Sequence, residues 1–287
     1  MQTGDNPHYL QKNKNANGSY KILDSKKLVT EMGLKRINND DKLRKEIISN
    51  GIPEKLFGGR VVVPYDKGGS SDIEAGRLNN YFFPTQFYIN WSQKNVQRMK
   101  TLSVAQRKKL YNETPIYDKD HDIVSAVFRN TSFYFNTGIT FSTTGLYAPT
   151  YRTNSSSIFD NKGSCIFLKN EFKNVFSIEF LLGILCSKLI RYIQKNFIKN
   201  TVDSTTDDIK ENPIPITDKV SKNKIEKLTT QIIKNQKKNP TYDYQKIEQI
   251  ELDAKVYEIF GLKNNLIDEV ENWFSRRYPK LSKIDEK

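Results

Sequence analysis

Two loops of this sequence combine glycines with aromatic, hydroxyl and basic side chains. The first is Tyr65-Asp66-Lys67-Gly68-Gly69, whose glycines let the backbone approach a phosphate closely, and Arg77 follows in the same loop. The second runs from Gly138 to Gly145, is rich in serine and threonine, and is followed by Tyr147 and Arg152. Hydroxyl, amide and guanidinium groups contact base edges and phosphate oxygens. Either loop alone is also typical of an ordinary surface loop, but together they favour nucleic-acid binding.

Residues that could form a catalytic centre are scarce. Asn6-Pro7-His8-Tyr9 is similar to the tetrapeptide that holds a flipped adenine in DNA amino-methyltransferases, but no buried strand precedes it. Gly68-Gly69-Ser70-Ser71 lacks the lysine of a phosphate-binding loop, and the chain has only two histidines. Asp243, Asp253 and Lys255 have the residue types of a metal-dependent nuclease, yet Asp253 and Lys255 fall inside a predicted helix. We therefore predict no active site, metal or cofactor in this chain.

The charge balance points to a polyanionic partner. Lys and Arg number 46 against 33 Asp and Glu, which gives a net charge of +13, and the pI is about 9.4. Nucleic acid is the first partner to consider, although chains from AT-rich genomes are often basic without binding anything. Two cysteines exclude a disulfide scaffold and a cysteine-rich zinc module. The start of the chain lacks a secretion signal, and the apolar stretch 176–185 is too short to cross a bilayer. We expect a cytoplasmic protein with no membrane partner.

The elements that position these loops change in character near Asn212-Pro213-Ile214-Pro215. Before it we predict strands at 60–65, 86–91, 123–128, 132–135 and 164–168, because short apolar runs alternate with polar residues. One helix, capped by Ser177, interrupts them. This pattern predicts an α+β fold, with a mixed sheet packed against helices. Residues 1–218 form the expected recognition domain, with a net charge of +9.

Residues 219–287, with a net charge of +4, form the expected helical domain. Three apolar stripes predict its helices: 225–233, one that begins near Thr241 with Ile247, Ile250, Ala254 and Tyr257 facing the core, and 266–273. The short turn at Asn239-Pro240 makes the first two helices an antiparallel hairpin. We expect this region to dock on a partner domain or on a second copy of the chain.

An ordered set of short motifs resembles one family. The segment Gln2-Thr3-Gly4-Asp5-Asn6 is similar to the QTGDN that follows the catalytic domain of large adenine-specific DNA methyltransferases. Those are the type IIG restriction-modification enzymes and the BREX phage-defence methyltransferases (PglX-like). Further similar segments follow in the same order at 63–69 (PYNKGG, with Asp66 for Asn), 90–91, 138–142 (GITWS, with Phe141 for Trp), 159–165, 181–188 (LLGLLNSK, with Cys186 for Asn), 212–215 and 256–262.

The resemblance implies a target-recognition (specificity) domain of the TaqI-like C-terminal type. It begins after the catalytic domain, so the chain is either a fragment that starts at Met1 or a separately encoded specificity subunit. The partners implied are double-stranded DNA and a methyltransferase or endonuclease part. That part would bind S-adenosylmethionine, and Mg²⁺ where cleavage follows. The residues expected to contact phosphate or guanine are Lys67, Arg77, Arg129 and Arg152, those expected to face the groove are Tyr65, Thr140, Ser142, Thr143 and Tyr147, and Gly69 allows close approach.

Three other functions stay open at this point. A specificity subunit like those of type I restriction systems predicts a dimer or two recognition domains. A nuclease using Asp243, Asp253 and Lys255 predicts Mg²⁺-dependent cleavage of plasmid DNA. An RNA-binding protein predicts a preference for single strands, with aromatic side chains stacked on bases. The target bases and the choice between restriction and modification alone are beyond what this sequence indicates.

Overall fold

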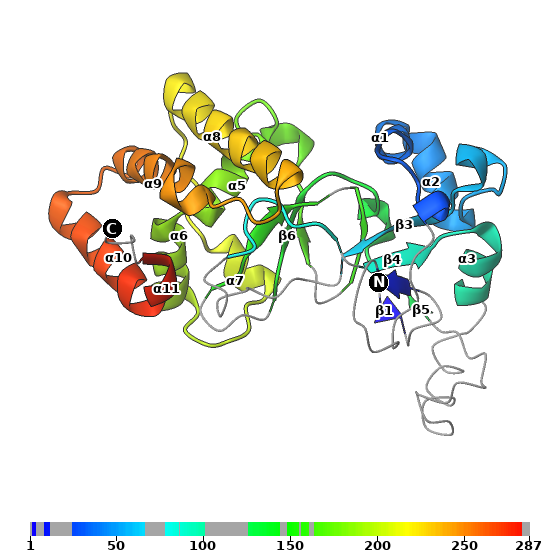
Figure 1. Cartoon of the computed structure of the whole chain (residues 1–287), viewed down its shortest axis with the longest axis horizontal. Coiled ribbons are helices and arrows are strands. Elements are labelled where there is room, and N and C mark those ends of the chain that lie inside the picture. The colour runs from blue at the N-terminus through cyan, green and yellow to red at the C-terminus, as the bar shows by residue number, and fades with distance from the viewer. Residues whose placement is uncertain are drawn as a thin grey trace. The chain divides into compact units, whose positions relative to one another are not determined.

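The computed structural model describes residues 2–3, 9–11, 25–66, 78–85, 87–100, 126–143, 148–154, 156–160 and 164–282. The chain divides into two compact units, each assembled from several segments. Unit 1 comprises residues 1–67, 85–137 and 155–161, and unit 2 comprises residues 68–84, 138–154 and 162–287. Helices and small sheets together give the α+β class that the sequence predicts (Figure 1). Among the described residues, no helix has both the length and the apolar composition of a bilayer span.

Unit 1 contains a four-stranded sheet and a separate strand pair. The sheet order is β2 (Tyr9–Gln11), β4 (Phe87–Asn90), β3 (Val62–Asp66) and β8 (Ile158–Phe159); the β3–β8 pairing is parallel and the other two are antiparallel. Strands β1 (Gln2–Thr3) and β5 (Ala126–Val127) form the pair. The helices are α1 (Glu31–Asn39), α2 (Asp41–Asn50) and α3 (Gln93–Lys100), with 3-10 turns at Ser25–Lys27, Leu56–Gly59 and Thr131–Phe133.

Helices α1 and α2 begin at side-chain caps. The Thr30 hydroxyl accepts a hydrogen bond from the Gly33 amide at 3.2 Å, and the Asp40 carboxylate accepts one from the Leu43 amide at 3.0 Å. Trp91 is fully buried, and its indole nitrogen donates to the carbonyl of Ile47 at 2.8 Å. This contact fixes α2 against the residue that follows β4.

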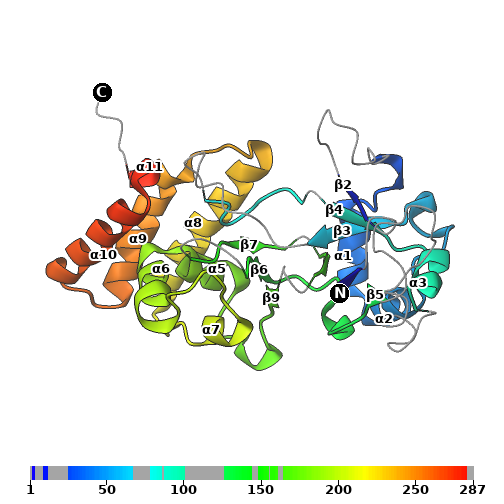
Figure 2. The same cartoon turned by 90° about the horizontal axis from the view of Figure 1, so that it is seen from below.

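Unit 2 contains a three-stranded antiparallel sheet covered by helices. Its order is β7 (Tyr151–Thr153), β6 (Ile139–Phe141) and β9 (Cys165–Ile166) (Figure 2). The helices are α5 (Ile178–Cys186), α6 (Lys188–Ile193), which continues as a π-helix at Gln194–Ile198, α7 (Thr206–Lys210), α8 (Lys219–Lys238), α9 (Glu248–Ile259), α10 (Asn264–Arg277) and α11 (Pro279–Ser282). Two 3-10 turns lie at Asn170–Phe172 and Tyr244–Lys246.

The core of unit 2 contains residues of the sheet, of helices before residue 218 in the sequence and of helices after it. Phe141 from β6, Phe180 from α5, Ile225 from α8 and Leu252 from α9 belong to one apolar cluster. Helix α8 lies along α5 (Figure 1) at Gly183, where an added Cβ would stand 2.6 Å from Ile225 Cγ2. The division into units therefore differs from the boundary expected after residue 218, because α8 and α9 share a core with the strands and α5.

Several predicted elements differ from the structure. Helices α1, α2 and α3 lie where only strands and loops were expected, and the predicted strand 132–135 contains a 3-10 turn instead. Strand β6 occurs where the hydroxyl-rich loop 138–145 was expected, and β7 and β8 lie where no strand was predicted. The helix capped by Ser177 is confirmed, but a second cap at Ser187 divides it into α5 and α6.

The face that α9 buries is also different from the prediction. The helix begins at Glu248 rather than near Thr241, and Ile247 and Ile250 are 63% and 56% exposed. Leu252, Val256 and Tyr257 are its buried apolar residues. The predicted stripe had the spacing of a helix but began from the wrong residue, because Ile247 precedes the first turn.

Candidate nucleic-acid interface

Four of the ten predicted DNA contacts, Lys67, Gly69, Arg77 and Tyr147, lie outside the described residues. Of the other six, Arg129 is exposed and Thr143 is half-buried. Tyr65 and Thr140 are 0% exposed, and Ser142 and Arg152 are each 4% exposed. The six are divided between the two units, with Tyr65 and Arg129 in unit 1 and the rest in unit 2.

The burial of Thr140 and Ser142 follows from their position on and beside the central strand β6. The Thr140 hydroxyl lies 3.3 Å from the Cys165 sulfur of β9. The Ser142 hydroxyl lies 3.2 Å from the Thr150 hydroxyl and accepts a hydrogen bond from the Thr150 amide, also at 3.2 Å. These side chains join neighbouring strands and have no surface for base contact. Their expected groove-facing role is therefore corrected.

Tyr65 and Arg152 are corrected for the same reason. Tyr65 lies in β3 of unit 1 and Arg152 in β7 of unit 2, and both are buried strand residues. A guanidinium or phenol enclosed by protein cannot reach a duplex without rearrangement. Within the described residues, the predicted set thus leaves Arg129 and Thr143 with solvent access.

The segment Leu78–Phe82 follows Arg77 and is anchored in unit 2 as an extra strand-like edge. The Tyr81 amide donates to the Tyr151 carbonyl at 2.8 Å, and the Thr153 amide donates to the Tyr81 carbonyl at 2.8 Å. Helices α8 and α9 hold the same segment. Gln236 donates to the Asn80 carbonyl at 3.1 Å and accepts from the Phe82 amide at 3.0 Å.

Two tyrosines complete this anchorage. The Tyr81 hydroxyl donates to Gln249 Oε1 of α9 at 2.7 Å, and the Tyr244 hydroxyl donates to the Leu78 carbonyl at 2.9 Å. The two rings meet edge to face with centroids 5.1 Å apart. Burial raises the pKa of both hydroxyls, so they stay protonated donors. The polypeptide leaving Arg77 is therefore fixed by buried polar groups.

A continuous basic face, here called the α8 lysine face, runs along the exposed side of α8. It consists of Lys219, Lys227, Lys234, Lys237 and Lys238, all exposed. At 100° per residue these five lie within one third of the helix circumference, opposite the buried Ile225, Leu228 and Ile232. Asn223 and Thr230 lie among them, and Gln231 and Glu226 border this face on its two sides.

The acidic residue of α8 is occupied elsewhere. Glu226 accepts a hydrogen bond from the Ser177 hydroxyl at 2.5 Å and pairs with Lys222 at 3.9 Å. Lys224 forms an ion pair with Glu251 of α9. No ion pair among the described residues involves a member of the α8 lysine face; Lys237 lies over the Phe82 ring at 5.7 Å. These positive charges are thus open to a solvent anion.

The first turn of α8 fixes where the lysine face begins. The Asp218 carboxylate accepts hydrogen bonds from the amides of Val220 and Ser221 at 2.8 and 2.9 Å. Hydrogen bonds from Ser221 lower the pKa of Asp218 to about 2. With its buried face on α5, α8 is a rigid support, so its lysines keep fixed spacings.

The residue set of the alternative nuclease is not brought together. Asp253 is 2% exposed and accepts from the backbone amide of Lys188 at 2.9 Å. Asp243 forms an ion pair with Lys246, and Lys255 forms one with Glu258; in both pairs the partners are three residues apart. Within the described ranges there is no group of three or more His, Cys, Asp or Glu side chains that could hold a metal.

No protein-family model matches the chain, and no curated protein matches it.

Sequence reasoning missed the α8 lysine face, although the signal was present. The notable pattern is Lys227, Lys234 and Lys238, separated by seven and four residues, which places them on one side of a helix. Attention to the apolar stripe identified the helix and its core side correctly.

Proposed function

We propose that this protein binds double-stranded DNA as the target-recognition module of an adenine-N6 DNA methyltransferase of a restriction-modification or phage-defence system. The observation that carries DNA binding is the α8 lysine face, which presents five exposed lysines that form no ion pair among the described residues. The net charge of +13 is consistent with the same partner. The association with a methyltransferase rests on the ordered motifs from Gln2 to Leu262.

The spacing of the lysines suits the backbone of a duplex. A helix rises about 1.5 Å per residue, so Lys227 and Lys238 stand about 16 Å apart along α8. Successive phosphates of one strand are about 3.4 Å apart along the duplex axis, so this distance spans several of them. Lysines act here as point charges that position the protein without reading sequence.

Base reading would then come from other elements. Arg77, Gly69 and Tyr147 remain candidates, since they lie outside the described residues. The anchored segment Leu78–Phe82 would hold the chain that leaves Arg77. S-adenosylmethionine, and Mg²⁺ where cleavage follows, would be bound by the methyltransferase or endonuclease part. The proposal implies action in the cytoplasm, where the DNA is.

The test is DNA binding by a variant that removes three of these lysines. We choose Lys227→Ala, Lys234→Ala and Lys238→Ala together, and measure duplex binding by fluorescence anisotropy over a range of salt concentrations. Each lost phosphate contact lowers the slope of log K against log salt by about 0.9, so a loss of about 3 is expected. The matched control replaces Lys210, Lys263 and Lys280, which are exposed outside α8.

The control separates a located interface from a general loss of charge. An equal loss in both triple variants would contradict the assignment to α8. A wild-type protein that bound single-stranded RNA in preference to duplex DNA would contradict the function itself. Selection from a random duplex library then tests whether binding depends on sequence.

A further inference from the structure

Unit 2 contains a small pocket whose lining is cationic. It has a volume of about 50 Å³, which is room for a few water molecules. Its polar lining comes from Asn80, Lys188, Arg191, Gln245, Gln249 and Ser282. Two of these residues are cations, and no carboxylate is found among the described residues that line the pocket. The pocket is separate from the α8 lysine face, none of whose residues lines it.

Arg191 is the unusual group in this pocket. The residue is 3% exposed, and its guanidinium contacts only neutral acceptors: the Ala148 carbonyl at 3.4 Å, the Tyr278 hydroxyl at 3.3 Å and Asn80 Oδ1 at 3.4 Å. The Tyr278 ring lies 5.6 Å from the guanidinium carbon. No ion pair among the described residues includes Arg191. A buried cation without a counter-ion among the described residues is costly, so this position favours an added anion.

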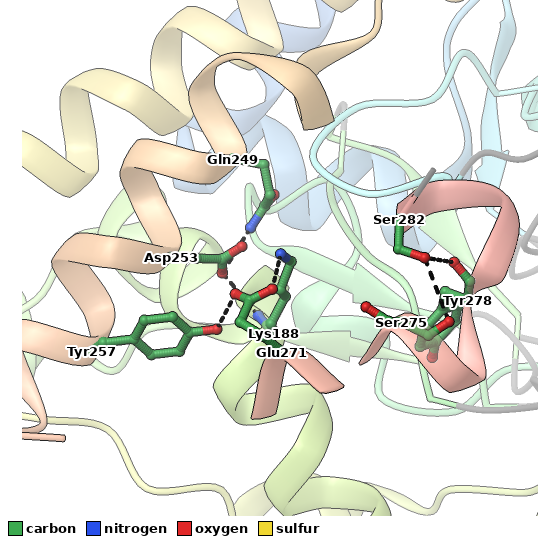
Figure 3. A network of polar contacts seen from close by, with 8 residues as sticks. All are labelled: Lys188, Gln249, Asp253, Tyr257, Glu271, Ser275, Tyr278 and Ser282. Atoms are coloured by element: carbon green, nitrogen blue, oxygen red, sulfur yellow. Dashed lines mark hydrogen bonds and ion pairs between the residues drawn. The ribbon is translucent and has the colours of Figure 1, made fainter. Parts of the chain in front are cut away.

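The neighbouring carboxylates serve other groups (Figure 3). Glu271 pairs with Lys188 Nζ at 2.6 Å and accepts from the Tyr257 hydroxyl at 2.7 Å. Asp253 accepts from the Lys188 amide at 2.9 Å and from Gln249 Nε2 at 3.1 Å. Neither carboxylate is a hydrogen-bond or ion-pair partner of Arg191, whose partners are Ala148, Tyr278 and Asn80.

Lys195 is a further cation near Arg191. Burial lowers the pKa of Lys195, and the positive charges of Arg191 and Arg277 lower it further. Lys188 is paired with Glu271, so that ion pair carries no net charge. Among the described residues, the charge of Arg191 is therefore not balanced by an ion pair.

We propose that this pocket binds a small oxyanion, a carboxylate or phosphate group, on the guanidinium of Arg191. The planar fork of arginine matches two oxygens of such a group. The amide of Gln245 can supply a further donor from the pocket wall. A volume of about 50 Å³, room for a few water molecules, suits a group as small as inorganic phosphate or a small carboxylate. This site is additional to the proposed DNA interface.

The test measures the thermal stability of the whole chain with phosphate, sulfate or acetate against sodium chloride at equal ionic strength. A ligand of the folded state raises Tm with its concentration, by about 5–10 °C at about one hundred times Kd. If only phosphate and sulfate raise Tm, the site requires a tetrahedral oxyanion. If acetate raises Tm as well, a carboxylate is enough for binding. No rise above chloride with any of the three would overturn the proposal.

Two variants place the effect in the pocket. Arg191→Met removes the cation, so the oxyanion-dependent rise should vanish. Gln245→Glu should likewise abolish the rise, because it supplies a carboxylate from the pocket wall at a half-buried position. Gln231→Glu, exposed on α8, adds the same charge elsewhere and should keep the rise. An unchanged rise in Gln245→Glu would overturn the proposal, whether or not Arg191→Met folds.

Discussion

Gln236 of α8 donates a hydrogen bond from Nε2 to the main-chain carbonyl of Asn80 at 3.1 Å, across 156 positions of sequence. The other end of the same amide accepts from the Phe82 amide at 3.0 Å. One buried side chain thus satisfies a donor and an acceptor of the segment that follows Arg77. The helical region and the region of the predicted DNA-contacting loop are in this way parts of one structural unit.

Replacing Gln236 by leucine should release this segment. The substitution keeps approximate volume but leaves the Asn80 carbonyl and the Phe82 amide with only their mutual hydrogen bond of 2.8 Å. We expect the loss of two hydrogen bonds to lower the free energy of unfolding by about 1–3 kcal/mol. Urea unfolding measures this. The control is Gln231→Leu on the exposed side of α8, and equal stability of the two variants would contradict the role.

Gly183 should not tolerate a side chain. A Cβ at this position would stand 2.6 Å from both Ile225 Cγ2 and Thr229 Oγ1, so α5 and α8 would have to separate. Gly183→Ala should destabilise the protein by about 1–3 kcal/mol, although alanine favours a helix. The comparison is Lys234→Ala on the exposed side of α8, which should change stability little. A Tm of Gly183→Ala at or above that of the wild type would show that the helices do not pack this closely.

How far the sequence predicts this fold depends on how local the signal is. Ser177 and the stripe Ile225, Leu228 and Ile232 predict α5 and α8 correctly, because caps and helical spacing act within one helix. The strand β6 was not predicted, since Thr140 is polar and is buried only through partners on β7 and β9. Such a strand forms because it pairs with strands that are distant in the sequence, which a local pattern does not indicate.

The candidate site shows the same limit. Hydroxyl-rich loops suggested exposed DNA contacts, yet the Thr140 and Ser142 hydroxyls bond to neighbouring strands. Sequence gives the chemistry of a side chain but not the direction in which it points. The lysines of α8 could have been identified, because once the buried side of a helix is known its exposed side is known as well.

The two cysteines should differ in reactivity. Cys186 is 3% exposed, and burial raises the pKa of its thiol to about 12, so almost no thiolate is present near pH 8. Cys165 is half-buried in β9. We expect one thiol to react with a disulfide reagent in the native protein and the second only in urea. In Cys165→Ala the native reaction should disappear, and a fast native reaction in that variant would contradict the burial of Cys186.

Asp253 should lower the free energy of unfolding as the pH rises from about 4 to about 7. Burial, the largest cause, raises the pKa of its carboxyl to about 7 from 3.8; the charge of Glu271 also raises it, while Lys188 and Gln249 lower it. Between these values the folded protein keeps a proton that the unfolded chain has released. The contribution of Asp253 to stability is therefore lost with increasing pH, at up to roughly 1.4 kcal/mol per pH unit.

Asp253→Asn isolates this contribution. Asparagine keeps an oxygen for the Lys188 amide and Gln249 but carries no charge, so its stability relative to the wild type should rise from pH 5 to pH 7 and then level off. Urea unfolding at pH 5, 6, 7 and 8 measures the difference, in which the other titrating groups cancel. Asp268→Asn, exposed on α10, serves as the control. A difference between Asp253→Asn and wild type that stays constant over this range would mean that the buried carboxyl does not take up a proton in the folded protein.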